Sequence, residues 1–229
     1  MNAKILEIFR SIQGEGKYAG CPQVFVRFFE CNMHCVWCDT PASMGGGKRA
    51  YKELSLKDAL RQVDALYDNA HCVSITGGEP LLQKDFLKSF CHALHWGGKK
   101  IYLDTNGTLP HALAEIIKDI DIIAMDIKLP SSTREKAFWA QHKEFLKVAR
   151  SKEVFVKAVI SLNTRPQEVL KAAKLVAAVD PEILFILQPN YRDMKNGIID
   201  KCAGYQKSCA KILKDVRILP QVHKFMKLR

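Results

Sequence analysis

The feature that most constrains the fold is a regular alternation of short apolar runs with longer amphipathic segments. An apolar run followed by an amphipathic helix is typical of a βα unit, and successive units build a parallel sheet. The pattern occurs six times. It predicts strands over 24–29, 72–75, 100–104, 121–126, 154–159 and 183–187, and helices over 55–67, 84–95, 112–118, 134–150, 166–179 and 199–214.

The length supports a single α/β domain covering residues 1–229. A chain of 229 residues that is 48% hydrophobic can bury a full core. It is shorter than the ~250 residues of a complete eight-unit barrel, and six βα units suit it better. In such α/β folds, functional side chains gather at the carboxyl ends of the strands, so we expect the functional residues there.

Three of the eight cysteines form a CxxxCxxC cluster directly after the first predicted strand, at Cys31, Cys35 and Cys38. Four thiolates usually hold a four-iron cluster, so three leave one iron free to bind a small molecule. A zinc knuckle or three unrelated buried thiols are alternatives. Zinc, however, usually takes four ligands from paired CxxC motifs.

This segment resembles the opening of the radical S-adenosylmethionine (SAM) enzymes. The resemblance implies a [4Fe–4S] cluster on the three thiolates, with SAM bound to the open iron through its amino and carboxylate groups. An electron from the cluster then cleaves SAM and releases a 5′-deoxyadenosyl radical. The resemblance also implies the fold, a radical SAM core built as a partial (β/α)6 TIM-like barrel.

Further motifs at strand ends resemble the SAM-binding residues of this superfamily. Residues 76–80, Thr-Gly-Gly-Glu-Pro, resemble the GGEP motif that holds the methionine amino group, although a Gly-Gly pair alone is usually only a turn. Trp37 matches an aromatic position beside the adenine, with plain packing as the alternative. Asp104 and Asn106 are further candidates, and any of these polar residues could instead cap a helix or form a turn. The residues predicted to bind SAM are Trp37, Asp39, Gly78, Glu79, Asp126, Lys128, Gln188 and Asn190.

The N-terminal segment narrows the resemblance to the 7-carboxy-7-deazaguanine synthase family. The run Ser-Ile-Gln-Gly-Glu-Gly over 11–16, the Cys-Asp-Thr at 38–40 and the Gln-Val-His-Lys at 221–224 carry it, so it spans the whole chain. It implies conversion of 6-carboxy-5,6,7,8-tetrahydropterin to 7-carboxy-7-deazaguanine and ammonia, in queuosine and deazapurine biosynthesis. The deoxyadenosyl radical takes a hydrogen from the carbon that bears the carboxylate. The ring then contracts, and the returning hydrogen regenerates SAM.

An anionic pterin needs a cation for its carboxylate and polar groups for its guanidine-like ring edge. Arg27 offers a planar fork that suits a carboxylate, although it could simply pair with an acidic neighbour. Gln13 and Glu15 can read the ring edge, unless their loop is only a turn. The resemblance adds Mg²⁺ on the hydroxyl of Thr40. The residues predicted to bind substrate are Ile12, Gln13, Gly14, Glu15, Arg27, Thr76, His223 and Arg229.

These motifs divide the domain into three parts. We expect an N-terminal substrate-binding segment over 1–22, the partial barrel over 23–215, and a C-terminal segment over 216–229 that closes the pocket. A glycyl-radical-enzyme activase is a rival interpretation, because it would share the CxxxCxxC and GGEP motifs. It would not need Arg27 or the Gln-Gly-Glu segment.

The net charge of +11, from 35 basic and 24 acidic residues, invites a metal-dependent RNA-binding module as a further rival. The basic residues are spread along the chain without a run of five or six, and basicity also suits anionic small molecules. We therefore expect no nucleic-acid partner.

The remaining expectations concern location and partners. The chain has no apolar stretch near the ~20 residues that span a bilayer and no secretory signal at its start, so we expect a cytoplasmic protein that does not bind membranes. The family resemblance implies a homodimer and a reducing partner, flavodoxin or ferredoxin.

Overall fold

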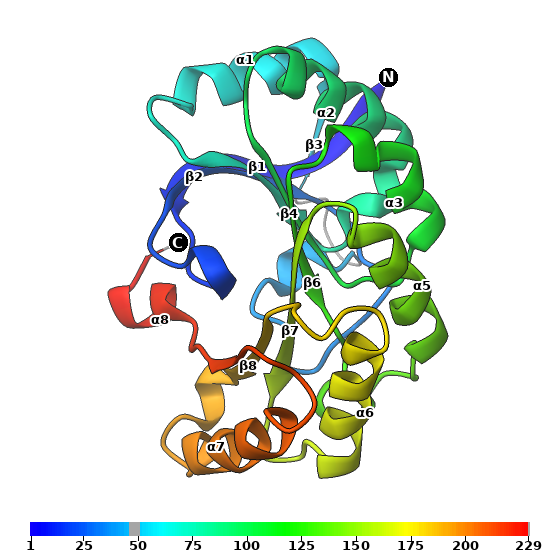
Figure 1. Ribbon diagram of the computed structural model, residues 1–229. Helices are drawn as coiled ribbons and strands as arrows, with labels where there is room; N and C mark the ends of the chain where they lie inside the picture. The colour runs from blue at the N-terminus through cyan, green and yellow to red at the C-terminus, as the bar shows by residue number, and fades with distance from the viewer. Residues whose placement is uncertain (46–50, 229) are drawn as a thin grey trace.

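The computed structural model describes residues 1–45 and 51–228, which fold around one curved mixed sheet (Figure 1). Within those residues nine strands are paired in the order β3-β1-β2-β4-β5-β6-β7-β8-β9. β1 runs antiparallel to β2 and β3, whereas β2 and β4 to β9 are parallel. The strands are β1 Asn2–Ile12, β2 Pro22–Phe28, β3 Lys52–Ser55, β4 Cys72–Gly77, β5 Ile101–Thr105, β6 Ile122–Asp126, β7 Glu153–Ile160, β8 Phe185–Pro189 and β9 Val216–Ile218.

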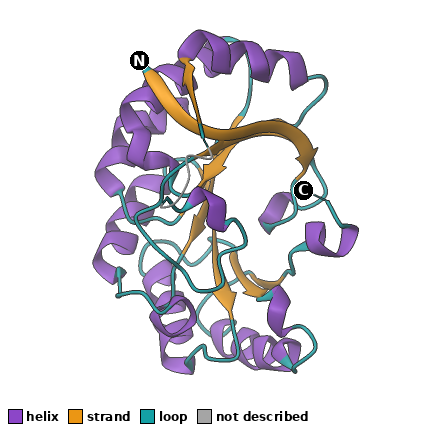
Figure 2. Cartoon of the chain, turned by 180° about the vertical axis from the view of Figure 1, so that it is seen from behind, coloured by secondary structure: helices purple, strands orange, loops and turns teal. Residues whose placement is uncertain are grey.

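Helices cover the outer, convex side of this sheet, and α8 lies on the open inner side together with the loop after β1 (Figures 1 and 2). No helix in the described ranges is both long and apolar enough to cross a membrane. The α-helices are α1 Leu56–Leu66, α2 Lys84–Trp96, α3 Pro110–Ile116, α4 Pro130–Thr133, α5 Trp139–Ala149, α6 Pro166–Ala177, α7 Ile198–Cys209 and α8 Val222–Met226. Short 3₁₀ helices are η1 Gly16–Tyr18, η2 Pro41–Ser43, η3 Pro80–Gln83, η4 Ile117–Asp119 and η5 Tyr191–Asp193.

The six predicted βα units are confirmed, with two boundary corrections. The helix predicted over 134–150 begins only at Trp139, because Arg134 adopts a left-handed conformation (φ 61°) that ends α4 instead. The helix predicted over 199–214 ends at Cys209. Ser55 caps α1 as its sequence position indicates, since its hydroxyl accepts a hydrogen bond from the backbone N–H of Asp58 at 3.2 Å.

The sheet also contains three strands that the prediction of six βα units lacks. β1 and β3 add an antiparallel edge before β2, and β9 adds a parallel strand after β8. The segment 1–22 is therefore a long strand followed by a loop, and a prediction of six strands was too low. The pairing of β1 with β2, including Glu7 opposite Arg27, attaches this loop to the barrel wall.

The two faces of the parallel strands serve different purposes, because successive side chains of a strand point to opposite sides. Outward side chains pack under the helices in the main core. Inward side chains form a second, smaller cluster with Cys72, Tyr102, Ile122, Ala124, Phe155, Leu184 and Ile186. Farther along the same strands the inward positions become polar at Thr76, Asp104, Asp126, Lys157 and Gln188. A polar layer thus lies on an apolar floor, at the carboxyl ends of the strands.

Candidate active site

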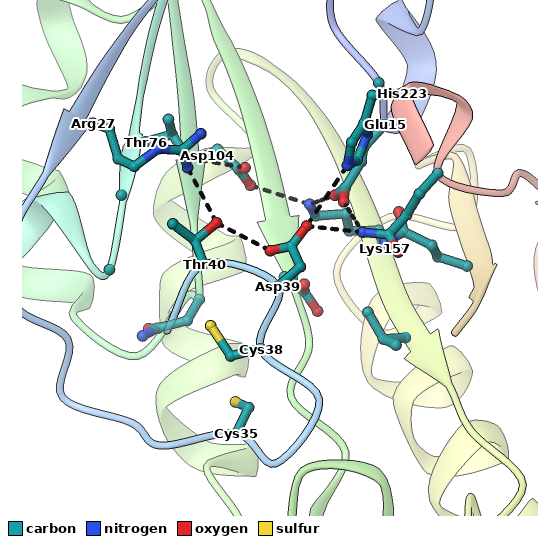
Figure 3. Close-up of a pocket in the computed structure, with 18 of the residues that line it drawn as sticks. Glu15, Arg27, Cys35, Cys38, Asp39, Thr40, Thr76, Asp104, Lys157 and His223 are labelled. Atoms are coloured by element: carbon teal, nitrogen blue, oxygen red, sulfur yellow. Dashed lines mark hydrogen bonds and ion pairs between the residues drawn. The ribbon is translucent and has the colours of Figure 1, made fainter. Parts of the chain in front are cut away.

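A cavity of about 390 Å³ lies over this polar layer (Figure 3). The loops after β1 and β2 and the segment around α8 complete its wall. Glu79 is not among the lining residues, and Arg229 lies outside the described residues. The predicted site residues that line the cavity are Ile12, Gln13, Gly14, Glu15, Arg27, Cys31, Cys35, Trp37, Cys38, Asp39, Thr40, Thr76, Gly78, Asp126, Lys128, Gln188, Asn190 and His223, together with the further candidates Asp104 and Asn106.

The three clustered cysteines lie in the loop after β2 and are the only cysteines among the described lining residues. Burial raises the pKa of each thiol, to about 11 for Cys35, which packs with Met33 and Phe138. The thiols are therefore protonated at neutral pH until a metal displaces the protons. Three thiols packed against apolar side chains, with no fourth beside them among the described residues, fit a cluster that has one open iron.

The cysteine loop is fixed to its neighbours by side-chain hydrogen bonds. The amide of Asn32 donates to the hydroxyl of Thr108 and accepts from the amide of Asn106, both at 2.8 Å. The indole N–H of Trp37 donates to the hydroxyl of Ser132 at 2.9 Å. These bonds determine the direction of the loop and leave the Trp37 ring on the cavity wall.

Glu79 of the GGEP motif binds the protein itself. Its buried carboxyl accepts from the hydroxyl of Thr105 at 2.9 Å, from the N–H of Asn106 at 2.8 Å and from the N–H of Leu81 at 3.1 Å. It therefore joins the loop after β4 to the loop after β5. The predicted contact of this side chain with SAM has no support in this geometry, because its oxygens face these donors and not the cavity.

The glycines of the motif are required by close backbone packing. A Cβ at Gly77, where φ is +141°, would lie 2.2 Å from the carbonyl oxygen of Phe28. A Cβ at Gly78 would lie 2.1 Å from the carbonyl oxygen of Glu30. Gly78 also lines the cavity, so its backbone is what the motif offers to a ligand.

One side of the cavity has unsatisfied acceptors that suit SAM. The ammonium of Lys128 lies 2.8 Å from Asp126 Oδ2 and 4.8 Å from the centre of the Trp37 ring. Asp126 Oδ1 and Gln188 Oε1 are buried, with no hydrogen-bond partner among the described residues. Buried acceptors without donors are costly. SAM carries an ammonium and ribose hydroxyls that would supply donors, so these residues fit the cofactor.

The opposite side of the cavity joins the N-terminal loop to the C-terminal segment (Figure 3). The carboxylate of Glu15 accepts from Lys157 and, at 2.6 Å, from the amide of Gln221. Asp39 Oδ2 lies 3.7 Å from His223 Nε2 and 3.5 Å from the ammonium of Lys224.

These contacts bring Asp39, which the sequence predicts to bind SAM, close to His223, which it predicts to bind substrate. Burial works to raise the pKa of Asp39, but its contact with His223 and the charge of Lys224 outweigh it and hold the pKa well below its usual range. Asp39 is thus a fixed negative charge facing the C-terminal segment.

Arg27, Thr40 and Asp39 form a chain of contacts across the cavity. The guanidinium of Arg27 pairs with Glu7 at 2.8 Å through Nε and donates from Nη1 to the Thr40 hydroxyl at 3.5 Å. Thr40 in turn donates to Asp39 Oδ1 at 3.2 Å. The alternative weighed for Arg27, pairing with an acidic residue, is therefore real, but a guanidinium has five N–H donors. It retains donors for a ligand in the cavity.

The side chain of Gln13 is used inside the protein. Its amide donates to Gln23 Oε1 and accepts from the N–H of Glu15, both at 3.0 Å, so it shapes the loop. Gly14 lies beneath His223, where a Cβ would come within 2.0 Å of the imidazole Nδ1. The carbonyl of Gly14 also accepts from the N–H of Val222 at 2.9 Å. α8 therefore rests directly on the Gln-Gly-Glu segment.

Sequence reasoning did not assign roles to Lys157, Gln221 and Lys224, which also line this wall. A lysine in the middle of the apolar strand β7 was a usable signal, because buried strands seldom contain an unpaired charge. Gln221 and Lys224 lay within a motif that was recognised, but their contacts with Glu15 and Asp39 depend on the chain folding back.

Comparisons with known proteins agree with this geometry. The sequence profile of the Radical SAM superfamily matches residues 26–185. A 7-carboxy-7-deazaguanine synthase from Geobacter sulfurreducens is 37% identical, covering 98% of this chain and 97% of the relative. One from Thermoplasma acidophilum is 36% identical, covering 97% and 96%.

The fold is similar to a crystal structure of QueE from Escherichia coli, with a TM-score of 0.66, 21% identity, and coverage of 96% of this chain and 94% of that one. Near-complete coverage of both sequences in each pair means that the similarity includes the N-terminal loop and the C-terminal segment as well as the barrel. The chain therefore belongs to the 7-carboxy-7-deazaguanine synthase family of the radical SAM superfamily.

Proposed function

We propose that the protein converts 6-carboxy-5,6,7,8-tetrahydropterin to 7-carboxy-7-deazaguanine and ammonia by radical ring contraction, in queuosine biosynthesis. The observation that carries the proposal is the shared cavity. Three thiols line one part of it, with no fourth among the residues that the structure describes, and charged groups suited to an anionic pterin line another. The full-length similarity to 7-carboxy-7-deazaguanine synthases supports the same activity.

Cys31, Cys35 and Cys38 would hold the [4Fe–4S] cluster, and Asp126, Lys128, Gln188 and Trp37 would hold SAM. When bound, the cluster and SAM supply the 5′-deoxyadenosyl radical that starts the reaction. Lys128, whose pKa is raised by Asp126 against the effect of burial, stays a cation for the methionine carboxylate. The chain's further contribution is to orient both ligands and to exclude water.

We propose that the pterin lies between the N-terminal loop and α8. Glu15 would accept hydrogen bonds from the ring edge, and Arg27 would bind the substrate carboxylate. Thr76, at the end of β4, and His223, on α8, would contact the ring from opposite sides, and Asp39 belongs with this group. α8 would close the cavity over the bound ring.

Mg²⁺ would bind at the Thr40 hydroxyl. The oxygens of Thr40 and Asp39 lie 3.2 Å apart and are the hard donors that this ion prefers. Mg²⁺ usually completes its octahedral shell with waters and substrate oxygens, so a small protein contribution fits. The ion would act as a template and Lewis acid for the substrate carboxylate.

We further propose a cytoplasmic location, a homodimer and reduction by flavodoxin or ferredoxin. Eight free thiols, three of them placed for iron, support a reducing compartment. The resemblance to the family supports the dimer and the electron donor.

Anaerobic reconstitution with iron and sulfide, followed by turnover with reductant, SAM and the pterin, tests the activity. We expect the ultraviolet absorbance of a deazapurine to appear. Cys35→Ala should abolish cluster loading and turnover, whereas Cys209→Ala, which removes a buried thiol in α7, should retain both. Full activity of Cys35→Ala, or zinc in place of iron in anaerobically purified protein, would contradict the proposal.

A further inference from the structure

Lys157 is a buried lysine on the cavity wall for which neither the cofactor nor the substrate assignments above require a role. It follows the floor residue Phe155 by two positions on β7, so its side chain also points inward, and only 5% of that side chain is exposed. Its ammonium forms ion pairs with Glu15 and, at 3.3 Å, with Asp104 (Figure 3). Burying such a charge is costly, and well-packed apolar residues often stabilise a fold equally well. The fold alone therefore gives little reason for a lysine here.

The contact with Lys157 fixes how Glu15 faces the cavity. One carboxylate oxygen of Glu15 accepts from Lys157, and the other accepts from the amide of Gln221 at 2.6 Å. An ionised carboxylate has about four acceptor positions. Each oxygen therefore keeps one acceptor position for a ligand, on a residue that lines the cavity. This arrangement suits two parallel N–H donors, which carboxylates bind in a bidentate manner.

The charges around Glu15 also depend on Lys157. Burial and the nearby charge of Asp39 work to raise the pKa of Glu15, whereas the charge and hydrogen bond of Lys157 and the hydrogen bond of Gln221 lower it, with a net lowering. Lys157 itself remains an ammonium, because Asp104 and Glu15 outweigh its desolvation. Lys157 thus favours the charged form of both carboxylates, whereas burial and the charge of Glu15 act against it and leave the pKa of Asp104 raised.

We propose that Lys157 is a positioning residue that holds the Glu15 carboxylate for the ring edge of the pterin, and so sets selectivity for rings that carry a 2-amino group beside a ring N–H. This inference rests on the proposed function, since it specifies which part of the substrate the N-terminal loop reads. It also predicts that substitution of Lys157 leaves SAM binding unchanged, because the proposed SAM contacts Lys128 and Asp126 pair with each other.

The test measures binding without turnover in the full-length enzyme, reconstituted with its cluster and supplied with SAM but no reductant. The probes are 6-carboxypterin, which is fluorescent and unreactive, and 6-carboxylumazine, which has an oxygen in place of the 2-amino group. We expect wild type to prefer the pterin at least tenfold. Lys157→Met should weaken pterin binding about 10- to 100-fold, as expected when hydrogen bonds to a charged group are lost. It should reduce the preference over lumazine to about threefold or less and change SAM affinity by less than about threefold.

Two comparisons separate positioning from a structural role. Lys99→Met removes another mostly buried lysine, 15% exposed and paired with Asp64 at 2.7 Å, away from the cavity, and should leave both probes unaffected. In a Glu15→Gln background, Lys157→Met should add little further loss, because the two residues act as a unit. Lys157→Gln replaces Lys157→Met if that variant does not fold.

Unchanged pterin affinity in the Lys157 variant, or an additive loss in the double variant, would overturn the inference while leaving the proposed function intact. A parallel loss of SAM and pterin binding would also overturn it, since it would mark a general disruption of the site. Failure of wild type to bind 6-carboxypterin would overturn the proposed function together with the inference.

Discussion

The buried carboxyl of Glu79 makes the stability of the cofactor-free protein depend on pH in a defined direction. Burial raises its pKa from an ordinary 4.5 to about 7, against the hydrogen bonds from Asn106, Leu81 and Thr105. Because the folded pKa is above the unfolded one, the folded state binds the extra proton between these values. The stabilising contribution is therefore complete below about pH 4.5 and is lost as the pH rises through about 7. At about 1.4 kcal/mol for each pKa unit, the loss corresponds to about 3 kcal/mol of unfolding free energy.

Urea unfolding of the cluster-free protein between about pH 5 and about pH 8, in reductant, measures this loss. Relative to Glu79→Gln, wild type should become less stable by about 2.5 kcal/mol across that range, because the range begins about two pH units below the folded pKa. The unfolding free energy of the variant can differ from that of wild type at any single pH, because the substitution replaces an acceptor oxygen with a donor. Only the slopes of unfolding free energy against pH are therefore compared. Glu115→Gln, at an exposed position, should follow the wild-type slope. Parallel slopes for wild type and Glu79→Gln would refute the reasoning.

Three further variants test separate parts of the cavity. Gly14→Ala places a Cβ 2.0 Å from His223 Nδ1, so it should raise KM for the pterin about tenfold or more with little change in Tm. The control Gly204→Ala should leave KM unchanged, because nothing in the described structure lies within 4 Å of the added Cβ. Thr40→Ala should weaken the Mg²⁺ dependence of turnover, and an unchanged Mg²⁺ titration would remove Thr40 from the site. Asp126→Asn disturbs both the Lys128 pair and the unpartnered Oδ1, so calorimetry should find SAM binding weakened about tenfold or more; equal SAM affinity would exclude Asp126 as a contact.

The six βα units could be predicted because their signals are local. Periodicity identifies each strand and helix, and a hydroxyl such as that of Ser55 marks a helix start without any long-range information. The start of α5 was predicted too early, at residue 134, for a local reason as well. Arg134 adopts a left-handed conformation that glycine or asparagine would have signalled and arginine does not.

The antiparallel edge could not be predicted in the same way. β1 alternates clearly only at Ala3 and Ile5, which are buried, and its later residues are partly exposed on both faces. Its identity as a strand comes from pairing with β2 and β3, and strand pairing is a long-range property. The motif at 11–16 overlaps the end of β1 only at residues 11–12 and indicates chemistry, not a strand.

Most residues that line the cavity could be predicted from sequence, whereas the hydrogen bonds and ion pairs among them could not. Polar residues at strand ends can be identified from sequence. Their partners cannot, as the contacts of Gln13 with Gln23 and of Asp39 with Lys224 illustrate. The first contact depends on the pairing of β1 with β2, and the second depends on where the C-terminal segment returns. The same limit applies to Lys157. Its charge within an apolar strand is visible in the sequence, but its ion pair with Glu15 is not.

The change from apolar to polar along single strands explains how one barrel serves both stability and chemistry. The inward neighbours of Lys157 and Asp104, two positions earlier, are Phe155 and Tyr102, which close the floor with fully buried rings. The floor separates the charged layer from solvent below, so the interactions of that layer are strengthened by a low dielectric. Charges so placed must be paired by the protein or by ligands. Lys157 is paired by the protein, whereas Asp126 Oδ1 has no partner in the described part of the chain. We therefore expect a bound ligand to supply the missing donor to Asp126 and to leave the ion pairs of Lys157 in place.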